Sequence, residues 1–257
     1  MKLPRLFLIL GLIALLGGCA SSTPRMAEVR EFAAQAPKLN AYHELTERYR
    51  DTYQREQPFL SSAADVRERV LDARRRDASA DFVKLQYGVQ AYMQALGTLA
   101  GDKQYDLEDQ VKGLGGGIKA WPDSGLEDRH VNAFAGLARL LTRAVTRQAQ
   151  EDAVMELMRD GQQPVQELLD AMRTLLRLYD KSNDNEQQIV LGMLDTEIPY
   201  LDPARDRLLL ALARSERQDK TAEYRLIGLR YTLARKNLDA IERGHRALIE
   251  QMPPATK

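Results

Sequence analysis

Cysteine is almost absent from this sequence, and that scarcity limits how the chain can be stabilised. Only one cysteine, Cys19, occurs among the 257 residues. No disulfide can therefore form within a single chain. The stability of any folded domain must come from the packing of its side chains, even in an oxidising compartment.

Net charge is also lacking. The 37 lysine and arginine residues equal the 37 aspartate and glutamate residues. Without residues 1–18, which hold Lys2 and Arg5, 35 basic side chains face 37 acidic ones, for a net charge of −2. Nucleic-acid-binding domains usually carry a basic footprint. We therefore expect no nucleic-acid partner.

The N-terminal apolar run is too short to span a membrane. It extends from Leu6 to Leu16, whereas a transmembrane helix needs about 20 apolar residues. Two basic residues, Lys2 and Arg5, precede it, and the small residues Gly17 and Gly18 follow. A basic start, a short apolar core and small residues before a cleavage point are typical of a secretory signal peptide.

The end of this segment, Leu16-Gly17-Gly18-Cys19, resembles the lipobox of bacterial lipoproteins. The resemblance implies that residues 1–18 are removed, that the Cys19 thiol carries a diacylglycerol and that the new amino terminus is acylated. Two or three acyl chains hold a protein durably on a bilayer. This covalent lipid is the only non-protein group that we expect, and the bilayer is the first expected partner.

The residue after the cysteine bears on the membrane that holds the protein. In lipoproteins of Gram-negative bacteria, an aspartate at this position favours retention in the inner membrane, whereas this chain has Ala20. The resemblance therefore implies the periplasmic face of the outer membrane; a Gram-positive host would change this location but not the anchor. Residues 19–36 are expected to be the lipidated cysteine and a tether.

The rest of the chain shows helical periodicity and little strand alternation. We predict an all-α fold, an antiparallel up-and-down helical bundle over residues 37–250, because helices joined by short connections pack as antiparallel neighbours. Two helical subdomains, 37–121 and 125–250, are one possible division, with the boundary at residues 122–124. Residues 251–257 are expected to be a disordered tail.

Local signals predict where individual helices begin and end. Ser124-x-x-Glu127 and Asn183-x-x-Glu186 have the spacing of capping boxes, which open helices. Gly101 and Gly161 are expected to close the helices that precede them. Apolar residues with 3-4 spacing mark the faces that we expect to be buried; they include Tyr42, Leu96, Leu141, Leu168, Leu226, Leu229 and Leu233.

Two Glu-x-x-His pairs offer a metal-binding hypothesis. Glu127 with His130, and Glu242 with His245, each place a carboxylate and an imidazole on one helix face. Two such pairs and two further glutamates form the di-metal site of ferritin-like bundles, and Glu197 is the one further glutamate that we can nominate. We nevertheless expect no metal, because both pairs lie near predicted helix ends, where water is hard to exclude.

Motifs for catalysis are missing. The sequence contains no His-Glu-x-x-His and no Gly-x-Ser-x-Gly. The run Gly115–Gly117 looks like part of a phosphate-binding loop, but such a loop follows a strand and ends in Lys-Ser or Lys-Thr, and neither feature is present here. If Cys19 is lipidated, no cysteine is left as a nucleophile. The expected role is therefore non-enzymatic.

Three functions remain open at this point. The first is a membrane-anchored envelope lipoprotein that binds or supports another envelope protein, for which an exposed apolar patch would be the sign. The second is a periplasmic immunity or inhibitor lipoprotein, for which we would expect a deep acidic cleft. The third is the di-metal bundle, which requires Glu127, His130, Glu242 and His245 to lie together. The sequence leaves the oligomeric state undetermined.

Overall fold

The computed structural model describes residues 26–101, 103, 107–145 and 151–252. Nearly all of this part is helical, and the only β-type pairing within it is an isolated bridge between Trp121 and Leu126. The predicted all-α bundle is confirmed. None of its helices combines the length and the apolar character that crossing a membrane requires. The lipobox, the lipidation residue Cys19 and the tail beyond residue 252 lie outside the described residues.

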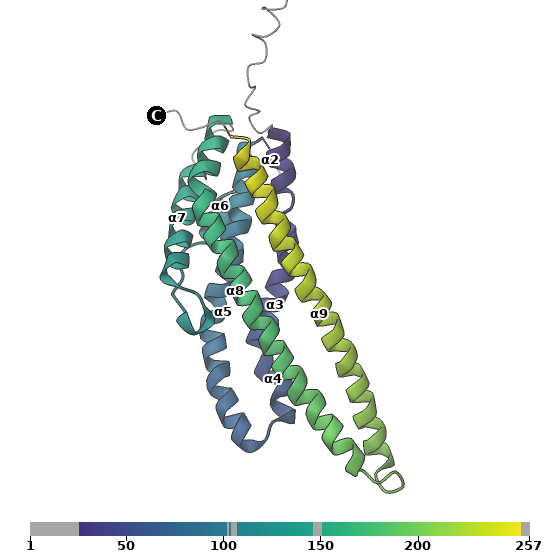
Figure 1. The fold of residues 1–257 in the computed structure, drawn as a ribbon. Coiled ribbons are helices and arrows are strands. Elements are labelled where there is room, and N and C mark those ends of the chain that lie inside the picture. Colours follow the sequence, from purple (N-terminus) through teal and green to yellow (C-terminus); the bar gives the residue numbers. More distant parts are fainter. Residues whose placement is uncertain (1–25, 102, 104–106, 146–150, 253–257) are drawn as a thin grey trace, which may run out of the picture.

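Three long helices form the frame of the bundle. They are α5 (Ser62–Leu99), α8 (Glu151–Glu197) and α9 (Arg207–Glu250), and α8 packs against both of the others. The shorter elements are α2 (Met26–Ala33), η2 (Ala36–Leu39), α3 (Asn40–Arg50), α4 (Thr52–Glu56), η3 (Gln57–Phe59), α6 (Leu107–Lys112), η4 (Pro122–Ser124), α7 (Asp128–Val145) and η5 (Ile198–Tyr200). In Figure 1 the hairpin of α8 and α9 projects beyond the other helices, at the end opposite to α2.

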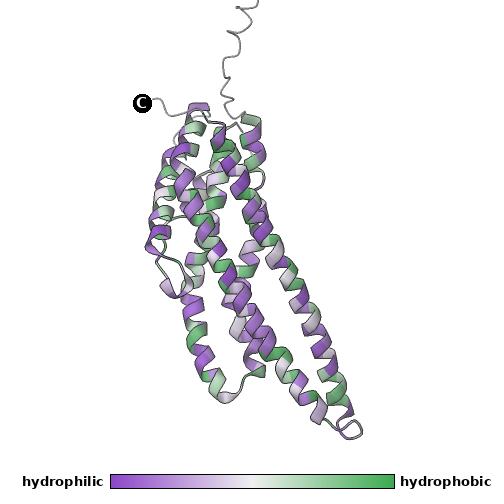
Figure 2. Ribbon diagram, viewed as in Figure 1, coloured by the Kyte–Doolittle hydropathy of each residue, from purple (hydrophilic) through white to green (hydrophobic). Residues whose placement is uncertain are grey.

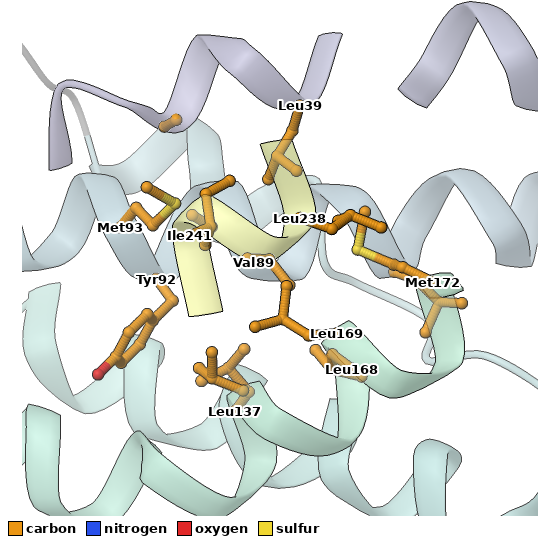
Figure 3. Close-up of a cluster of buried hydrophobic side chains, with 14 of the residues drawn as sticks. Leu39, Val89, Tyr92, Met93, Leu137, Leu168, Leu169, Met172, Leu238 and Ile241 are labelled. Carbon is orange, nitrogen blue, oxygen red and sulfur yellow. The ribbon is translucent and has the colours of Figure 1, made fainter. Parts of the chain in front are cut away.

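One continuous hydrophobic core joins these elements. It runs from Val29 in α2 to Leu248 in α9. Its centre contains Val89 of α5, Leu137 of α7 and Leu168 of α8, whose side chains converge in Figure 3. A second, small cluster of Val190, Leu194 and Tyr224 lies between α8 and α9 nearer the projecting end. Phe59 of η3 packs against this cluster.

The helical body begins earlier than the sequence analysis predicted. Residues 26–36 were assigned to the tether, but α2 starts at Met26 and its Val29 and Phe32 are buried. Val29, Phe32, Ala36 and Leu39 have 3-4 spacing, so this face packs onto the core as an amphipathic helix does. This 3-4 spacing is the sequence signal that indicates a helix before residue 37.

Two expected helix boundaries are wrong, because α8 runs through both. Gly161 lies within α8, where the Tyr92 ring packs so closely that a Cβ atom would lie 2.5 Å from it. Asn183 and Glu186 are also inside α8, and both side chains are buried rather than capping a helix start. The expectation for Gly101 fits the structure better, since α5 ends at Leu99 and Gly101 has a φ of 90°.

The expected capping box at Ser124 and Glu127 is also wrong. Helix α7 begins at Asp128, and the Ser124 hydroxyl donates to the carbonyl oxygen of Trp121. The backbone N–H of Glu127 donates instead to Nδ1 of His130, at 3.0 Å. The His130 imidazole thus accepts from the Glu127 N–H at the helix start. The predicted capping box would have paired this N–H with the Ser124 hydroxyl.

Candidate functional site

The first candidate histidine, His130, is a structural residue at the start of α7. Its side chain is fully buried, and its Nδ1 accepts the Glu127 backbone hydrogen bond. Burial, followed by the positive charge of Arg129, lowers the pKa of His130. The imidazole is therefore neutral at neutral pH, with its proton on Nε2, which lies 3.7 Å from a carboxylate oxygen of Asp170.

The second candidate histidine, His245, packs inside the bundle on α9. Burial lowers its pKa to about 4, so the ring is neutral at neutral pH. The Tyr92 hydroxyl and His245 Nε2 form a hydrogen bond of 2.8 Å, and the Phe32 ring stacks on the imidazole with centroids 5.8 Å apart. Its sequence partner Glu242 points elsewhere and accepts hydrogen bonds from Arg173, Gln166 and Arg246.

The two Glu-x-x-His pairs therefore do not assemble a common site. Within the described part of the chain, the one group of three possible ligands with close ligand atoms is His130, Glu167 and Asp170. The Arg129 guanidinium donates to both of these carboxylates at 2.7 Å, so part of their charge is already compensated. The nominated Glu197 lies exposed at the end of α8.

The glycine run forms a turn rather than a nucleotide loop. Gly116 and Gly117 have φ angles of 79° and 62°, a conformation that favours glycine. Lys84 of α5 donates to the Gly117 carbonyl oxygen at 2.7 Å. The run thus connects α6 to the segment before α7 and is held against α5.

A buried ionic network, which the sequence analysis missed, fixes the direction of the projecting hairpin. Glu186 of α8 is 1% exposed and accepts hydrogen bonds from Arg55 at 2.7 and 2.9 Å and from Arg48 at 3.1 Å. Arg48 also donates to Glu223 of α9 at 2.8 Å, and Tyr224 of α9 donates to Glu186. The network joins α3, α4, α8 and α9. Its one sequence signal is that Arg48 and Arg55 lie seven residues apart, the spacing of one face in a continuous helix, although the structure places them in α3 and α4.

Exposed leucines cover the outer face of α9, and the prediction that Leu229 is buried is wrong. Leu226, Leu229 and Leu233 are 57%, 63% and 51% exposed, and Leu208 and Leu212 nearer the hairpin turn are 74% and 59% exposed. We call these five residues the outer seam. Figure 2 shows hydrophobic residues along α9, including the part that projects beyond the other helices.

Helix α9 carries a second apolar stripe, and that one faces the core. Tyr224, Ile227, Tyr231, Ala234 and Leu238 are buried, with the same 3-4 spacing as the outer seam. Because the two stripes lie on different faces of one helix, the bundle can cover only one of them. The tyrosine-containing stripe is the one that packs, and the leucine stripe remains in solvent.

A basic groove adjoins the outer seam. It has a volume of about 750 Å³ and lies between the end of α8 and the first half of α9. Arg214, Arg217 and Arg225 line it, with Asp195 as the one acidic residue, and Asp195 is paired with Arg217. Ala222 lines the groove and lies on the face of α9 that bears the seam. The seam leucines therefore lie in two groups, residues 208–212 and 226–233, and the arginine-lined groove lies beside the polar stretch between them.

Sequence periodicity detected the residues of the outer seam but assigned them to the wrong environment. The polar stretch from Ser215 to Lys220 was the available signal, since it interrupts this stripe and a core stripe seldom contains such a gap.

Comparison of the chain with protein-family models, with curated proteins and with solved structures finds no match.

Proposed function

We propose that this chain is a lipid-anchored helical lipoprotein of the bacterial envelope, and that the outer seam of α9 binds an acidic amphipathic helix of another envelope protein. The observation that supports the proposal is the row of exposed leucines on α9. Contiguous apolar surface on a soluble domain commonly marks an interaction site. In this proposal the protein has a binding role and performs no catalysis.

The spacing of the seam favours a helix as the partner. Leu226, Leu229 and Leu233 follow one another at intervals of three and four residues, as do core residues of a coiled coil. A facing helix with the same spacing can insert its apolar side chains between them. Such a groove-and-helix contact is a recurrent mode of peptide recognition.

Charge favours a foreign acidic helix over a second copy of this chain. From residue 225 to 236, α9 carries four basic residues and no acidic one. Arg230 and Arg235 pair with Glu44 and Asp180 of neighbouring helices, so Arg225 and Lys236 supply the positive charge that these pairs leave. A two-fold symmetric dimer would place this basic surface against itself, and like charges in apposition oppose association. The arginines of the adjoining groove have the same effect, and they also disfavour the acidic cleft that the inhibitor alternative requires.

A lipid anchor at Cys19 would leave the seam at a distance from the membrane. The start of α2 and the end of α9 lie at one end of the bundle (Figure 1), and Cys19 precedes Met26 by seven residues. At about 1.5 Å per helical residue, the seam extends roughly 25 to 60 Å along α9 from that end. A lipidated Cys19 would therefore present the seam to a partner beyond the headgroup layer.

Anchoring can be tested by changing the lipidation residue. We expect Cys19→Ser to abolish incorporation of a clickable fatty acid and to release the chain from the membrane fraction or leave its signal peptide uncleaved. The reason is that a serine hydroxyl does not replace the thiolate in forming the thioether to diacylglycerol. Fatty-acid label on the serine variant, or no label on the unaltered protein, would contradict the proposed anchor.

Partner binding can be tested by making the seam polar. We expect Leu226→Ser, Leu229→Ser and Leu233→Ser together to reduce the partner recovered after cross-linking in cells at least tenfold, on the order of 1.4 kcal/mol. Circular dichroism should remain that of a folded bundle, because all three side chains are exposed. The matched control is Val66→Ser with Val70→Ser, two exposed apolar residues of α5. Equal recovery from the seam variant and the control would contradict the proposal.

A further inference from the structure

A second feature, separate from the outer seam, is a cavity of about 520 Å³ bounded by α4, α5, α8 and the η4 turn. Its lining includes the aromatic side chains of Tyr49, Phe82 and Trp121. It also includes the ionisable side chains of Glu56 and Arg75. Ten of the sixteen residues that line it are polar or charged. Its volume is in the range of small-molecule sites.

Two of the polar groups are poorly satisfied. The Glu56 side chain is fully buried, and no donor from a neighbouring residue other than Glu68 reaches its carboxylate oxygens; it can form a hydrogen bond with the Glu68 carboxyl group only while one of the two holds a proton. Arg75 is 7% exposed, and its Nε–H has no acceptor, although its Nη2 donates to Glu68 at 2.6 Å. Buried polar atoms without partners are costly. A ligand that supplied the missing donor would relieve part of that cost.

The neighbour of Glu56 is a second carboxyl group, that of Glu68. Burial, and then the interaction with Glu68, raises the pKa of Glu56 to about 8, while Arg75 opposes the rise and Glu186 of α8 adds to it. The other charges around the cavity are Lys181 of α8 and the Arg74–Asp123 pair. At neutral pH Glu56 therefore holds a proton, which it can share with the Glu68 carboxylate.

A cation can take the place of that shared proton. An ammonium group between the two carboxylates would supply N–H donors to both and balance the charge that Glu56 gains when its proton leaves. A bare metal ion between the carboxylates would make no use of the aromatic side chains that line the cavity. An organic amine instead places an apolar body against them, and its charge interacts favourably with an aromatic face.

Contacts with other side chains hold the aromatic rings of the cavity in position. The Trp121 indole N–H donates to Asp81 of α5 at 2.9 Å, which fixes the position of the ring. Tyr49 stacks on Tyr179 with ring centroids 4.6 Å apart, and Phe82 packs beside the same tyrosine. The aromatic surface is therefore preorganised by the bundle.

From this arrangement we propose that the cavity binds a small arylalkylamine, with its ammonium group between Glu56 and Glu68 and its ring against Trp121. This site does not depend on the outer seam or on its partner. The proposal gives a ligand-binding role to the charged side chains of Glu56, Glu68 and Arg75. The packing of the bundle alone does not require them.

The probe is 2-phenylethylamine added to the intact protein. Trp121 is the only tryptophan of the chain, so its fluorescence reports directly on the cavity. We expect a saturable change with the amine. The matched probes 2-phenylethanol, which is neutral, and 3-phenylpropionate, which is an anion, should bind at least tenfold more weakly. Equal responses to the three probes would mean that ring burial alone drives binding, and would overturn the proposal.

Proton release gives a readout that a merely structural role would not change. Because the amine displaces the proton of Glu56, whose pKa is raised by burial, calorimetry in buffers of different ionisation enthalpy should show net proton release on binding at pH 7. The affinity should rise by up to about tenfold per pH unit until pH 8 and then level off. Binding without proton release, or an affinity that is constant from pH 6 to 8, would overturn the proposal.

The variant that tests the assignment is Glu56→Gln, which keeps the shape of the side chain and removes its charge. We expect proton release to disappear and the affinity for 2-phenylethylamine to fall at least tenfold. Glu197→Gln, an exposed change on α8, should leave both unchanged. If Glu56→Gln does not fold, Glu68→Gln is expected to show the same tenfold loss. Unchanged binding and proton release in a folded variant would refute the site.

Discussion

Glu186→Gln should lower the free energy of unfolding by about 3–5 kcal/mol, the largest loss that we expect from a single charge change. The physical reason is that Glu186 is 1% exposed and compensates two arginines, Arg48 and Arg55, whose side chains are only 13% and 20% exposed. Glutamine can keep some of the hydrogen bonds but not the charge. Arg48 would then keep its ion pair with Glu223, and Arg55 would lose its ion pair with Glu186.

Chemical denaturation followed by circular dichroism measures this loss. Glu197→Gln is the matched control, since it makes the same change on the same helix at an exposed position. Its effect should be within about 0.5 kcal/mol of zero. Similar values for the two variants would show that the network at Glu186 does not hold α3, α4, α8 and α9 together as we infer.

Leu141→Ala should cost about 2–5 kcal/mol, whereas Leu229→Ala should cost less than about 0.5 kcal/mol. Leu141 of α7 is 1% exposed and lies in the main core, so truncation leaves a cavity. Leu229 is 63% exposed, and alanine is a slightly better helix former. The same truncation thus separates a core leucine from a seam leucine.

The measurement is again the free energy of unfolding, taken for both variants under one set of conditions. A large loss for Leu229→Ala would place this side chain inside the isolated protein and remove the basis for the outer seam. A small loss for Leu141→Ala would mean that α7 contributes little to the core.

The sequence predicts the fold class well because helical periodicity is a local property. The stripe of α5 that includes Phe82, Leu85 and Leu96 is buried as expected. Which of two stripes packs is not local, and α9 shows this. Its tyrosine stripe and its leucine stripe have the same spacing, and only the arrangement of α8 and α3 decides between them. The predicted division into two subdomains stays a prediction.

The capping boxes failed for a related reason. Asn183 and Glu186 have the spacing of a helix start, but their side chains are used by arginines 131 to 138 residues away in sequence. A partner that distant cannot be identified from one sequence. The same limit applies to the cavity, where Glu56, Glu68 and Trp121 come from three separate segments.

The outer seam as a binding surface for an acidic helix is the central claim, and site-specific photo-cross-linking in living cells tests it most directly. A photoreactive amino acid is placed at Leu229, with Val70 of α5 as an exposed control position. The account predicts an adduct with one other envelope protein from position 229 only, and mass spectrometry should locate it in an acidic amphipathic helix. Adducts only with a second copy of the chain, the same adducts from position 70, or none from position 229 would contradict it.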